Sequence, residues 1–419
     1  MAILSLALKS LLNRRATALL TLASIALSVA LLVGVERLRT ETRASFASTI
    51  SGTDLIVGAR SGPVQLLLYS VFRIGNATNN ISWESYQDIA AQPRVAWTVP
   101  LSLGDSHRGF RVLGTTNAYL EHYRYGRDQP LAVARGTWLD DLFDAVLGAE
   151  VAAQLGYDIG DRVTIAHGAG DVAFARHDDK PFRVTGILAR TGTPVDRTVH
   201  VSLAAIEAVH VGWRGGAPTP GIEVSAERVR GMDLTPEAIT AVLVGLDSRI
   251  ATFGVQRWVN DYPEEPLLAV LPGVALAELW SLLGVAENAL LVVSACVVLV
   301  GLIGMLTALL IGLNERRREM AILRSVGARP AQVMALIVGE AAFLTLLGVT
   351  AGVGLLYLLL AAAQPVLASE LGLFIAIGAP SLREWLLLAA VLSAGVLAGV
   401  LPGWRAYRMS LTDGLSIRV

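Results

Sequence analysis

Residues 314–329 read NERRREMAILRSVGAR, and this stretch decides the fold because it separates two long apolar runs. Residues 288–313 before it carry no charge, and the apolar run that begins at Pro330 is interrupted only by Glu340. Arginine and lysine beside membrane spans stay on the cytoplasmic side of the membrane. The stretch is therefore predicted to be a cytoplasmic loop that connects two membrane spans.

The loop also has the pattern of a short amphipathic helix over residues 319–328. Met320 and Leu323 fall on one face of such a helix, Ile322 and Val326 lie beside that face, and arginines occupy much of the rest. Two interpretations stay open at this point. The helix is either a basic anchor at the lipid surface or a helix that docks into a partner protein.

The composition is that of an integral membrane protein. Of the 419 residues, 53% are hydrophobic and only 16% are charged, and the mean hydropathy is +0.56. Four segments are long and apolar enough to cross a bilayer, since roughly twenty helical residues rise about 30 Å. The predicted fold class is a membrane protein with four transmembrane α-helices and a large extracytoplasmic α+β domain inserted between helices one and two.

The basic flanks of these segments set the orientation. Lys9, Arg14 and Arg15 precede the first span, whereas the loop between spans three and four has Arg383 as its single basic residue. Both termini are therefore predicted to be cytoplasmic. The predicted segments are a cytoplasmic segment at 1–15, helix 1 at 16–37, the external domain with two lobes at 38–278, helix 2 with an external extension at 279–313, the cytoplasmic loop at 314–330, helix 3 at 331–366, a short external loop at 367–383, helix 4 at 384–404 and a cytoplasmic tail at 405–419.

The external region has the pattern of a globular α+β domain. A helix is predicted to begin at Thr235-Pro236, where a capping residue precedes a first-turn proline, and to bury Val242. Another helix is predicted to end at Gly156. The apolar run 64–72 is too short to span, so a buried helix is favoured over contact with a membrane surface or a hydrophobic ligand. Strands are predicted at 163–165, 182–184 and 199–203, and a flexible connection or surface loop at 215–221.

Small residues recur at four-residue spacing along the spans, and such stripes let helix backbones approach closely in lipid. In the first two spans a transmembrane interface is predicted at Ala26, Ala30, Gly34, Ala308 and Gly312. The glycines of the third and fourth spans are predicted to pack within the chain; they are Gly348, Gly352, Gly395, Gly399 and Gly403. The spacing does not identify which helix each stripe meets.

The motifs of common enzymes are absent. The two lysines, Lys9 and Lys180, do not follow a glycine, so the chain has no phosphate-binding GxxxxGK[ST] loop. There is no HExxH or GxSxG motif either, and the closest candidate for a metal site, His177-Asp178-Asp179, is interpreted as a solvated turn. The chain is therefore predicted not to be an enzyme and to bind no metal or cofactor. The net charge of −1 gives no reason to expect a nucleic-acid partner.

Glu340 is the one acidic residue well inside an apolar stretch. Acids within membranes are costly and often functional. Because Glu340 follows Arg329 by only eleven residues, it is expected near the cytoplasmic interface. A structural role, either pairing with an arginine or capping the turn before the third span, is favoured over proton transfer.

These features resemble the MacB/FtsX type of ABC-transporter permease. The loop ERRREMAILRSVGARPAQV resembles the signature of that family between its second and third spans, and Glu340-Ala341 resembles its acidic-small pair. The opening LALKSLLNRRATALLTLASIALSVALLVGV and the ending PGWRAYRMSLTDGLSIRV are similar to the ends of these proteins. Externally, VLGAEVAAQLGYDIGDRVTI and FRVTGILARTGTPVDRTVHVSL resemble the periplasmic domain of the family.

The resemblance implies the permease subunit of an ABC transporter in a bacterial inner membrane, without the fused ATPase segment of MacB. Two permease copies, expected as a homodimer, would each receive a separate cytoplasmic ABC ATPase that carries ATP and Mg²⁺. The loop helix would dock in the ATPase as a coupling helix, with apolar side chains filling a groove and arginines fixing the register. Its residues are Glu319, Met320, Ala321, Ile322, Leu323, Arg324, Ser325, Val326, Gly327 and Ala328.

In this reading, ATP hydrolysis drives a rearrangement of the periplasmic domain that exports or extracts a substrate. The alternative is an FtsX-like signalling subunit that regulates a periplasmic partner without transport. A stand-alone secondary transporter is disfavoured because the spans show no inverted repeat and almost no charge within the membrane. Membrane lipid and a periplasmic adaptor or effector are the other expected partners. The sequence leaves the substrate, the periplasmic partner and the choice between homodimer and heterodimer open.

Overall fold

The computed structural model describes residues 15–167, 175–176, 179–214, 217–218, 224–371, 375 and 377–408. These residues belong to two compact units. The helical unit draws on residues within 1–42, 284–365 and 375–419, and the inserted domain draws on residues within 43–283 and 366–374. The two units are described separately below.

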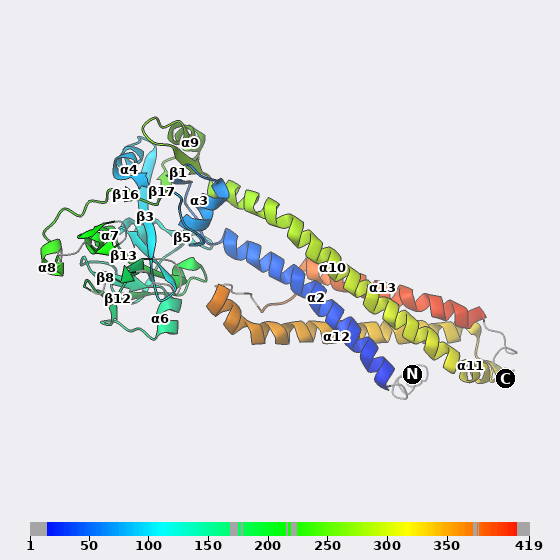
Figure 1. The fold of residues 1–419 in the computed structure, drawn as a ribbon. Coiled ribbons are helices and arrows are strands. Elements are labelled where there is room, and N and C mark those ends of the chain that lie inside the picture. The colour runs from blue at the N-terminus through cyan, green and yellow to red at the C-terminus, as the bar shows by residue number, and fades with distance from the viewer. Residues whose placement is uncertain are drawn as a thin grey trace. The chain divides into compact units, whose positions relative to one another are not determined.

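The helical unit contains α2 (Arg15–Ala47), α10 (Pro272–Glu315), α11 (Arg317–Ser325), α12 (Pro330–Leu371) and α13 (Leu382–Arg408) (Figure 1). All but α11 are long and apolar enough to cross a membrane, which confirms the four predicted spans. The helices extend past the predicted ends of the spans. With 44 residues, α10 is about 66 Å long, whereas a hydrocarbon core is about 30 Å thick.

Glycines of the third and fourth spans pack against neighbouring helices of the same chain. A Cβ atom on Gly348 of α12 would lie 2.5 Å from the Ile25 side chain of α2. A Cβ atom on Gly395 of α13 would lie 2.2 Å from the Thr345 hydroxyl of α12. These glycines are therefore needed because the backbones are close together, and the prediction of packing within the chain is confirmed for both spans.

The inserted domain is built around one mixed sheet. Its strand order is β18 (Leu267–Val270), β1 (Leu55–Ala59), β17 (Ala241–Leu246), β3 (Val95–His107), β4 (Phe110–Thr115), β13 (Thr198–Ser202), β8 (Asp144–Leu147), β12 (Phe182–Leu188) and β7 (Val133–Gly136). At the side of this order, β9 (Arg162–Val163) pairs with β12, and β10 (Ala166–His167) pairs with β3 and β11 (Ala175–Arg176). Three short pairs accompany the sheet: β2 (Ile81–Ser82) with β16 (Ala238–Ile239), β5 (Arg124–Tyr125) with β6 (Gln129–Pro130), and β14 (Trp213–Arg214) with β15 (Ala217–Pro218).

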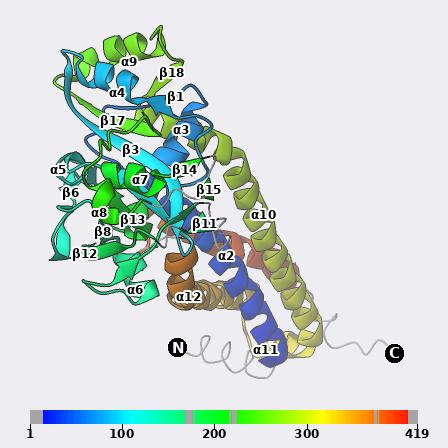
Figure 2. The same cartoon turned by 60° about the vertical axis from the view of Figure 1, so that its left-hand side comes forward.

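The long strand β3 runs through both halves of this sheet (Figure 2). Its first half pairs with β17, and its second half pairs with β4. One face of the sheet carries a continuous apolar core that includes Ile56, Leu101 and Val146. The opposite face carries two separate cores, one around Val242 and one around Val199. The two predicted lobes therefore share a sheet and differ in what covers its second face.

Helices cover both faces of the sheet, and the strands' alternating side chains explain why. The helices are α3 (Pro63–Ser70), α4 (Trp83–Ala90), α5 (Ala118–His122), α6 (Ala149–Leu155), α7 (Leu203–His210), α8 (Ala226–Val229) and α9 (Thr252–Asn260), with 3₁₀ turns η1 (Pro194–Arg197) and η2 (Arg249–Ala251). Contacts place α3 and α5 over β1 and β3, α9 over β18, and α7 over β4 and β13. Serine caps such as Ser82 and Ser202 begin α4 and α7 by accepting a backbone N–H.

Several local predictions meet different outcomes. The predicted helix after Thr235-Pro236 is wrong, because residues 241–246 form β17, a strand buried between β1 and β3. Its apolar run AVLVGL is buried on both faces, and such runs give no periodicity that separates strand from helix. The helix that ends at Gly156 is confirmed, with Gly156 in the left-handed conformation at φ 68°. The run 64–72 contains the buried helix α3, as predicted. Most of 215–221 and of His177-Asp178-Asp179 lies outside the described residues.

Candidate functional site

The short helix α11 connects α10 and α12 within the basic loop. It covers Arg317–Ser325, so it begins and ends slightly before the predicted segment 319–328. The backbone N–H of Ala328 donates to the Leu323 carbonyl, and that of Gly327 donates to the Arg324 carbonyl. These two hydrogen bonds cap the C-terminal end of the helix and require a residue in the left-handed conformation, which is Gly327 at φ 107°. Pro330 then starts α12 with the fixed φ that suits a first helical position.

The apolar residues of α11 divide between two faces, which corrects the prediction that Met320, Ile322, Leu323 and Val326 all fill one groove. Met320 is 4% exposed and belongs to an apolar cluster with Leu313 and Ile337. Leu323 is half-buried against the same cluster. These two side chains therefore hold α11 onto its own bundle, and the amphipathic pattern alone did not show which apolar residues the bundle would take.

Two apolar residues face outward, Ile322 on α11 and Val326 directly after it. Ile322 is 56% exposed and Val326 is 83% exposed. Arg318 and Glu319 are exposed one turn before them, so the face combines two apolar side chains with charges of both signs. An exposed apolar pair next to arginines on a short helix is the pattern of a helix that enters a groove of another molecule.

Arg316 joins three helices at the base of α11. Its Nε atom donates to Glu319 Oε2 at 3.1 Å, and its Nη1 atom donates to Glu340 Oε2 at 3.0 Å. Arg316 lies between α10 and α11, whereas Glu340 lies on α12, and both residues are buried. Glu340 is thus paired with an arginine, which is one of the two structural roles considered from sequence. Removing either partner would leave a buried, unpaired charge.

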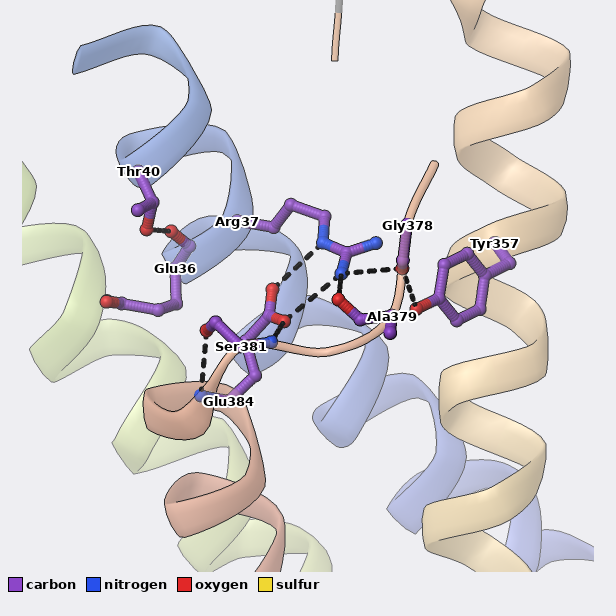
Figure 3. Close-up of polar contacts among 8 residues, drawn as sticks. All are labelled: Glu36, Arg37, Thr40, Tyr357, Gly378, Ala379, Ser381 and Glu384. Atoms are coloured by element: carbon purple, nitrogen blue, oxygen red, sulfur yellow. Dashed lines mark hydrogen bonds and ion pairs between the residues drawn. The ribbon is translucent and has the colours of Figure 1, made fainter. Parts of the chain in front are cut away.

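A second group of charges lies at the opposite end of the helical unit from α11. We call it the Arg37 cluster, and it comprises Glu36, Arg37, Arg39, Glu287, Arg383 and Glu384. Arg37 of α2 donates to both carboxylate oxygens of Glu384 on α13, with Nε at 2.9 Å and Nη2 at 3.1 Å (Figure 3). Arg39 of α2 likewise donates to Glu287 of α10 at 2.9 Å. The cluster therefore links α2, α10 and α13.

The start of α13 explains why Glu384 is fixed for this pairing. The backbone N–H of Ser381 donates to Glu384 Oε2 at 2.7 Å, and the N–H of Glu384 donates back to the Ser381 hydroxyl at 3.3 Å (Figure 3). This reciprocal arrangement is a capping box. Arg37 also donates to the carbonyls of Gly378 and Ala379, and its guanidinium lies 5.1 Å from the ring of Tyr357 on α12. Arg37 thus joins three of the four spans, α2, α12 and α13.

Sequence reasoning missed the Arg37 cluster, although its signals were present. Glu36-Arg37-Leu38-Arg39 follows the first span, and the pattern Ser381-x-x-Glu384 precedes the fourth span. The second pattern identifies a helix start. Neither pattern predicts which residues form ion pairs, because residues 36 and 384 are far apart in the chain.

The small residues of the first span face α12 of the same chain. Ala26 and Ala30 are buried, and a Cβ atom on Gly34 would lie 3.1 Å from Leu356 of α12. This stripe packs between spans one and three of the same chain. The small residues of the second span behave differently, since Ala308 and Gly312 line a crevice against α2.

The motif VLGAE of the inserted domain has a structural role. A Cβ atom on Gly148 would lie 2.3 Å from the Val195 carbonyl, so only glycine lets the start of α6 approach η1 this closely. Glu150 pairs with Arg197 at 3.0 Å. Burial raises the pKa of Asp196, although the N–H groups of Thr191 and Gly192 donate to its carboxylate. These contacts tie the motif to the TGTPVD segment that follows β12.

No group of three or more metal-binding side chains is found within the part of the chain that the structure describes. The buried carboxylates of Glu36, Asp144, Asp196, Glu340 and Glu384 are held by arginine, hydroxyl or backbone N–H groups. The notable chemistry of the described residues is therefore ionic and lies at the two ends of the helical unit, around Arg316 and around Arg37.

Two protein families match this chain. Residues 18–242 match the MacB-like periplasmic core domain, and residues 291–411 match the FtsX-like permease C-terminal domain. Among solved structures, the periplasmic region of MacB from Actinobacillus actinomycetemcomitans covers 55% of this chain at 11% identity with a TM-score of 0.34.

Curated relatives match over half of the chain or more. The macrolide export ATP-binding/permease protein MacB of Azoarcus sp. is 26% identical over 413 residues, which is 93% of this chain and 55% of that protein. The ABC transporter permease MJ1507 of Methanocaldococcus jannaschii is 28% identical, over 66% of this chain and 63% of the relative. The lipoprotein-releasing system transmembrane protein LolC of Neisseria meningitidis is 24% identical, over 50% and 46% respectively. The chain thus spans about half to two thirds of each relative.

Proposed function

Because this chain belongs to the MacB/FtsX-type family of ABC-transporter permeases, we propose that it couples ATP hydrolysis by a partner ATPase to a rearrangement of its inserted domain. The rearrangement exports or extracts a substrate. In this proposal the inserted domain is periplasmic, the α11 end is cytoplasmic and the membrane is the bacterial inner membrane. The arginines around α11 support this orientation, since basic residues beside spans stay cytoplasmic.

The observation that carries the proposal is the division of α11 into an inward and an outward face. Met320 and Leu323 fasten the helix to its own bundle, while Ile322 and Val326 stay exposed. Outside lipid, this apolar pair gains free energy by entering a groove. The groove in the ATPase would accept Ile322 and Val326 and offer acidic groups to Arg318.

Arg316 gives such docking a mechanical consequence. It binds Glu319 of α11 and Glu340 of α12, and it directly follows α10. A displacement of α11 would therefore act on the second and third spans together. At the other end of the bundle, the Arg37 cluster ties α2 to α10 and α13, so those spans would move with them.

The proposed assembly contains two permease copies and two ATPase copies. Lipid or the second permease copy would cover the apolar side chains that α10 exposes, such as Val292, Leu299 and Ile303. ATP and Mg²⁺ would bind the ATPase, since these 419 residues contain no GxxxxGK[ST] loop. A periplasmic adaptor or effector would contact the inserted domain.

The test is Ile322→Asp in the full chain, purified together with a candidate partner ABC ATPase. Full burial of an isoleucine is worth about 1.5–3 kcal/mol, so the variant is expected to weaken ATPase binding at least about tenfold and to abolish the stimulated ATP turnover. The matched control is Ile250→Asp, the same exchange at an isoleucine of the inserted domain that is 93% exposed. ATPase binding by Ile322→Asp at the level of this control would refute docking through the outward face.

A further inference from the structure

The fourth span, α13, packs by one face and leaves the opposite face exposed. Its glycines Gly395, Gly399 and Gly403 face α12, because a Cβ atom on each would lie between 2.2 and 3.1 Å from an atom of that helix. On the other side, exposed residues recur every three or four positions, and they are Leu382, Leu386, Ala390, Ser393, Leu397, Leu401 and Trp404. The Ser393 hydroxyl donates to the carbonyl of Ala389 within the helix. This face is therefore apolar, and its one hydroxyl already has a partner.

Tryptophans mark both ends of this apolar stretch. Trp385 and Trp404 are exposed, and α13 rises about 28 Å from one to the other. The hydrocarbon core of a bilayer is about 30 Å thick, and tryptophan prefers the two interfaces at its edges. Among the four spans, only the sequence of α13 has a tryptophan at each end of its apolar run. The exposed face of α13 therefore has the length and the ends of a surface that crosses a bilayer in contact with lipid.

The last turn of α13 is basic. Arg405, Tyr407 and Arg408 are exposed there, and the Arg408 guanidinium lies 4.5 Å from the ring centre of Trp404. Within the described part of the chain, neither arginine forms an ion pair with an acidic residue. Two guanidinium groups without an acidic neighbour attract an anion, and their N–H groups match the oxygens of a phosphate. The charge of this end therefore selects a negatively charged partner.

We propose that α13 is a lipid-facing span, and that Arg405 and Arg408 beside Trp404 bind the phosphate of an anionic phospholipid. The acyl chains of this lipid lie along Leu401 and Leu397, which continue the same face of the helix. This adjoining apolar face identifies the phosphate as that of a lipid, since a free phosphate ion would leave it uncovered. The second permease copy then contacts a span other than α13. The assignment of the headgroup to the cytoplasmic leaflet rests on the proposed function, whereas the lipid contact itself does not.

The first test asks whether lipid covers the apolar face. In the full chain, Cys296→Ser removes the native thiol, and Leu397→Cys carries a nitroxide label. The labelled protein is placed in vesicles of dioleoyl phosphatidylglycerol and dioleoyl phosphatidylcholine. The label is expected to be relaxed by oxygen, which dissolves in lipid, and not by a water-soluble nickel chelate. Ile250→Cys, at an exposed isoleucine of the inserted domain, is the matched control and should respond to the chelate.

The competing occupant of this face is a second copy of the chain. A second copy would shield the Leu397→Cys label from both reagents, and its own label would broaden the spectrum; either result would overturn the proposal. The spectra are recorded with and without a candidate partner ABC ATPase, so that the assembled complex is included. Lipid contact is read from the label and ATPase binding from co-purification, so this proposal and the proposed function fail separately.

The second test concerns the basic end of α13. The full chain is placed without ATPase in nanodiscs of the same two lipids, and the lipids that it retains are counted by native mass spectrometry. Arg405→Gln/Arg408→Gln is expected to lower the preference for phosphatidylglycerol at least about fivefold, since one arginine beside an anionic surface accounts for about that factor. Arg317→Gln/Arg318→Gln is the charge-matched control, because it removes two exposed arginines from α11, which has no tryptophan, and it should lower the preference less. Equal losses in the two double variants would show only the general attraction of a basic surface for anionic lipid and would overturn the site.

Discussion

His200 makes the stability of the inserted domain depend on pH. It lies on β13 and is fully buried, its Nδ1–H donates to the Val146 carbonyl, and its Nε2 atom has no partner in the described structure. Burial lowers the pKa of His200 from 6.5 to about 3. The nearby Arg73 guanidinium also lowers it, and the bond to Val146 opposes the change. The folded domain therefore keeps this imidazole neutral under conditions in which the unfolded chain would protonate it.

The magnitude follows from the difference in pKa. The unfolded histidine binds a proton below about pH 6.5, so stability is complete above that value and is lost as the pH falls toward 3. A pH of about 5 lies about 1.5 units below the pKa of the unfolded histidine. Protonation therefore stabilises the unfolded state by about 2 kcal/mol at this pH. The carboxyls of Glu150 and Asp196, whose pKa burial raises, act in the opposite direction because acid relieves their buried charge.

The assay is hydrogen–deuterium exchange of the full chain in nanodiscs, with rates from β13 peptides corrected for intrinsic exchange at about pH 7.5 and 5. His200→Asn removes the titrating group. Relative to this variant, the wild-type chain is expected to lose about 2 kcal/mol of opening free energy on acidification. His122→Asn is the matched control, since it removes a histidine that is partly exposed. Equal pH dependence in the wild-type chain and His200→Asn would refute the reasoning.

Two further predictions concern the helical unit. Arg37→Met strips the buried Glu384 of its arginine and is expected to cost about 3 kcal/mol in thermal or denaturant unfolding, whereas the double variant Arg37→Met/Glu384→Gln recovers part of that loss; a double variant as unstable as the sum of both single variants would contradict the coupling. Gly352→Leu is expected to abolish the folded, monodisperse protein in size-exclusion chromatography, because its Cβ would lie 2.6 Å from the Ala26 carbonyl. Gly354→Leu, which meets nothing within 4 Å, should elute like the wild-type chain.

Hydropathy and charge predict the membrane part of this fold because each span carries its own signal. An apolar run of sufficient length and a basic flank are properties of one segment, and the four helices follow from them. The inserted domain is harder, since β17 is an apolar run whose strand state depends on β1 and β3, which lie far away in the sequence. The pattern that predicted a helix was therefore wrong, because pairing with these distant strands decides the structure and no short stretch of sequence contains it.

The candidate site shows the same limit at the level of single residues. The basic loop and Glu340 stand out in sequence, because charge inside or beside a span is rare. The amphipathic pattern of residues 319–328 did not show that α12 and α13 would take Met320 and Leu323, which leaves Ile322 and Val326 outside. Which apolar side chains are buried depends on the rotation of this nine-residue helix about its own axis. The hydrogen bonds that end the helix at Gly327 fix that rotation.

The two buried ionic groups of the helical unit differ in what their disruption would do. The Arg37 cluster joins α2 to α13 through two ion pairs and contains a capping box, so one weakened contact leaves these two helices connected. Arg316 has fewer connections. Its partner Glu319 is 66% exposed, so water competes with Arg316 for that carboxylate, and Glu340 is the main buried partner of Arg316. A change at Glu340 therefore reaches α11 directly, whereas a comparable change at the other end is shared among several contacts. The base of α11 is for this reason the place where a small ligand or a partner protein can most readily shift the bundle.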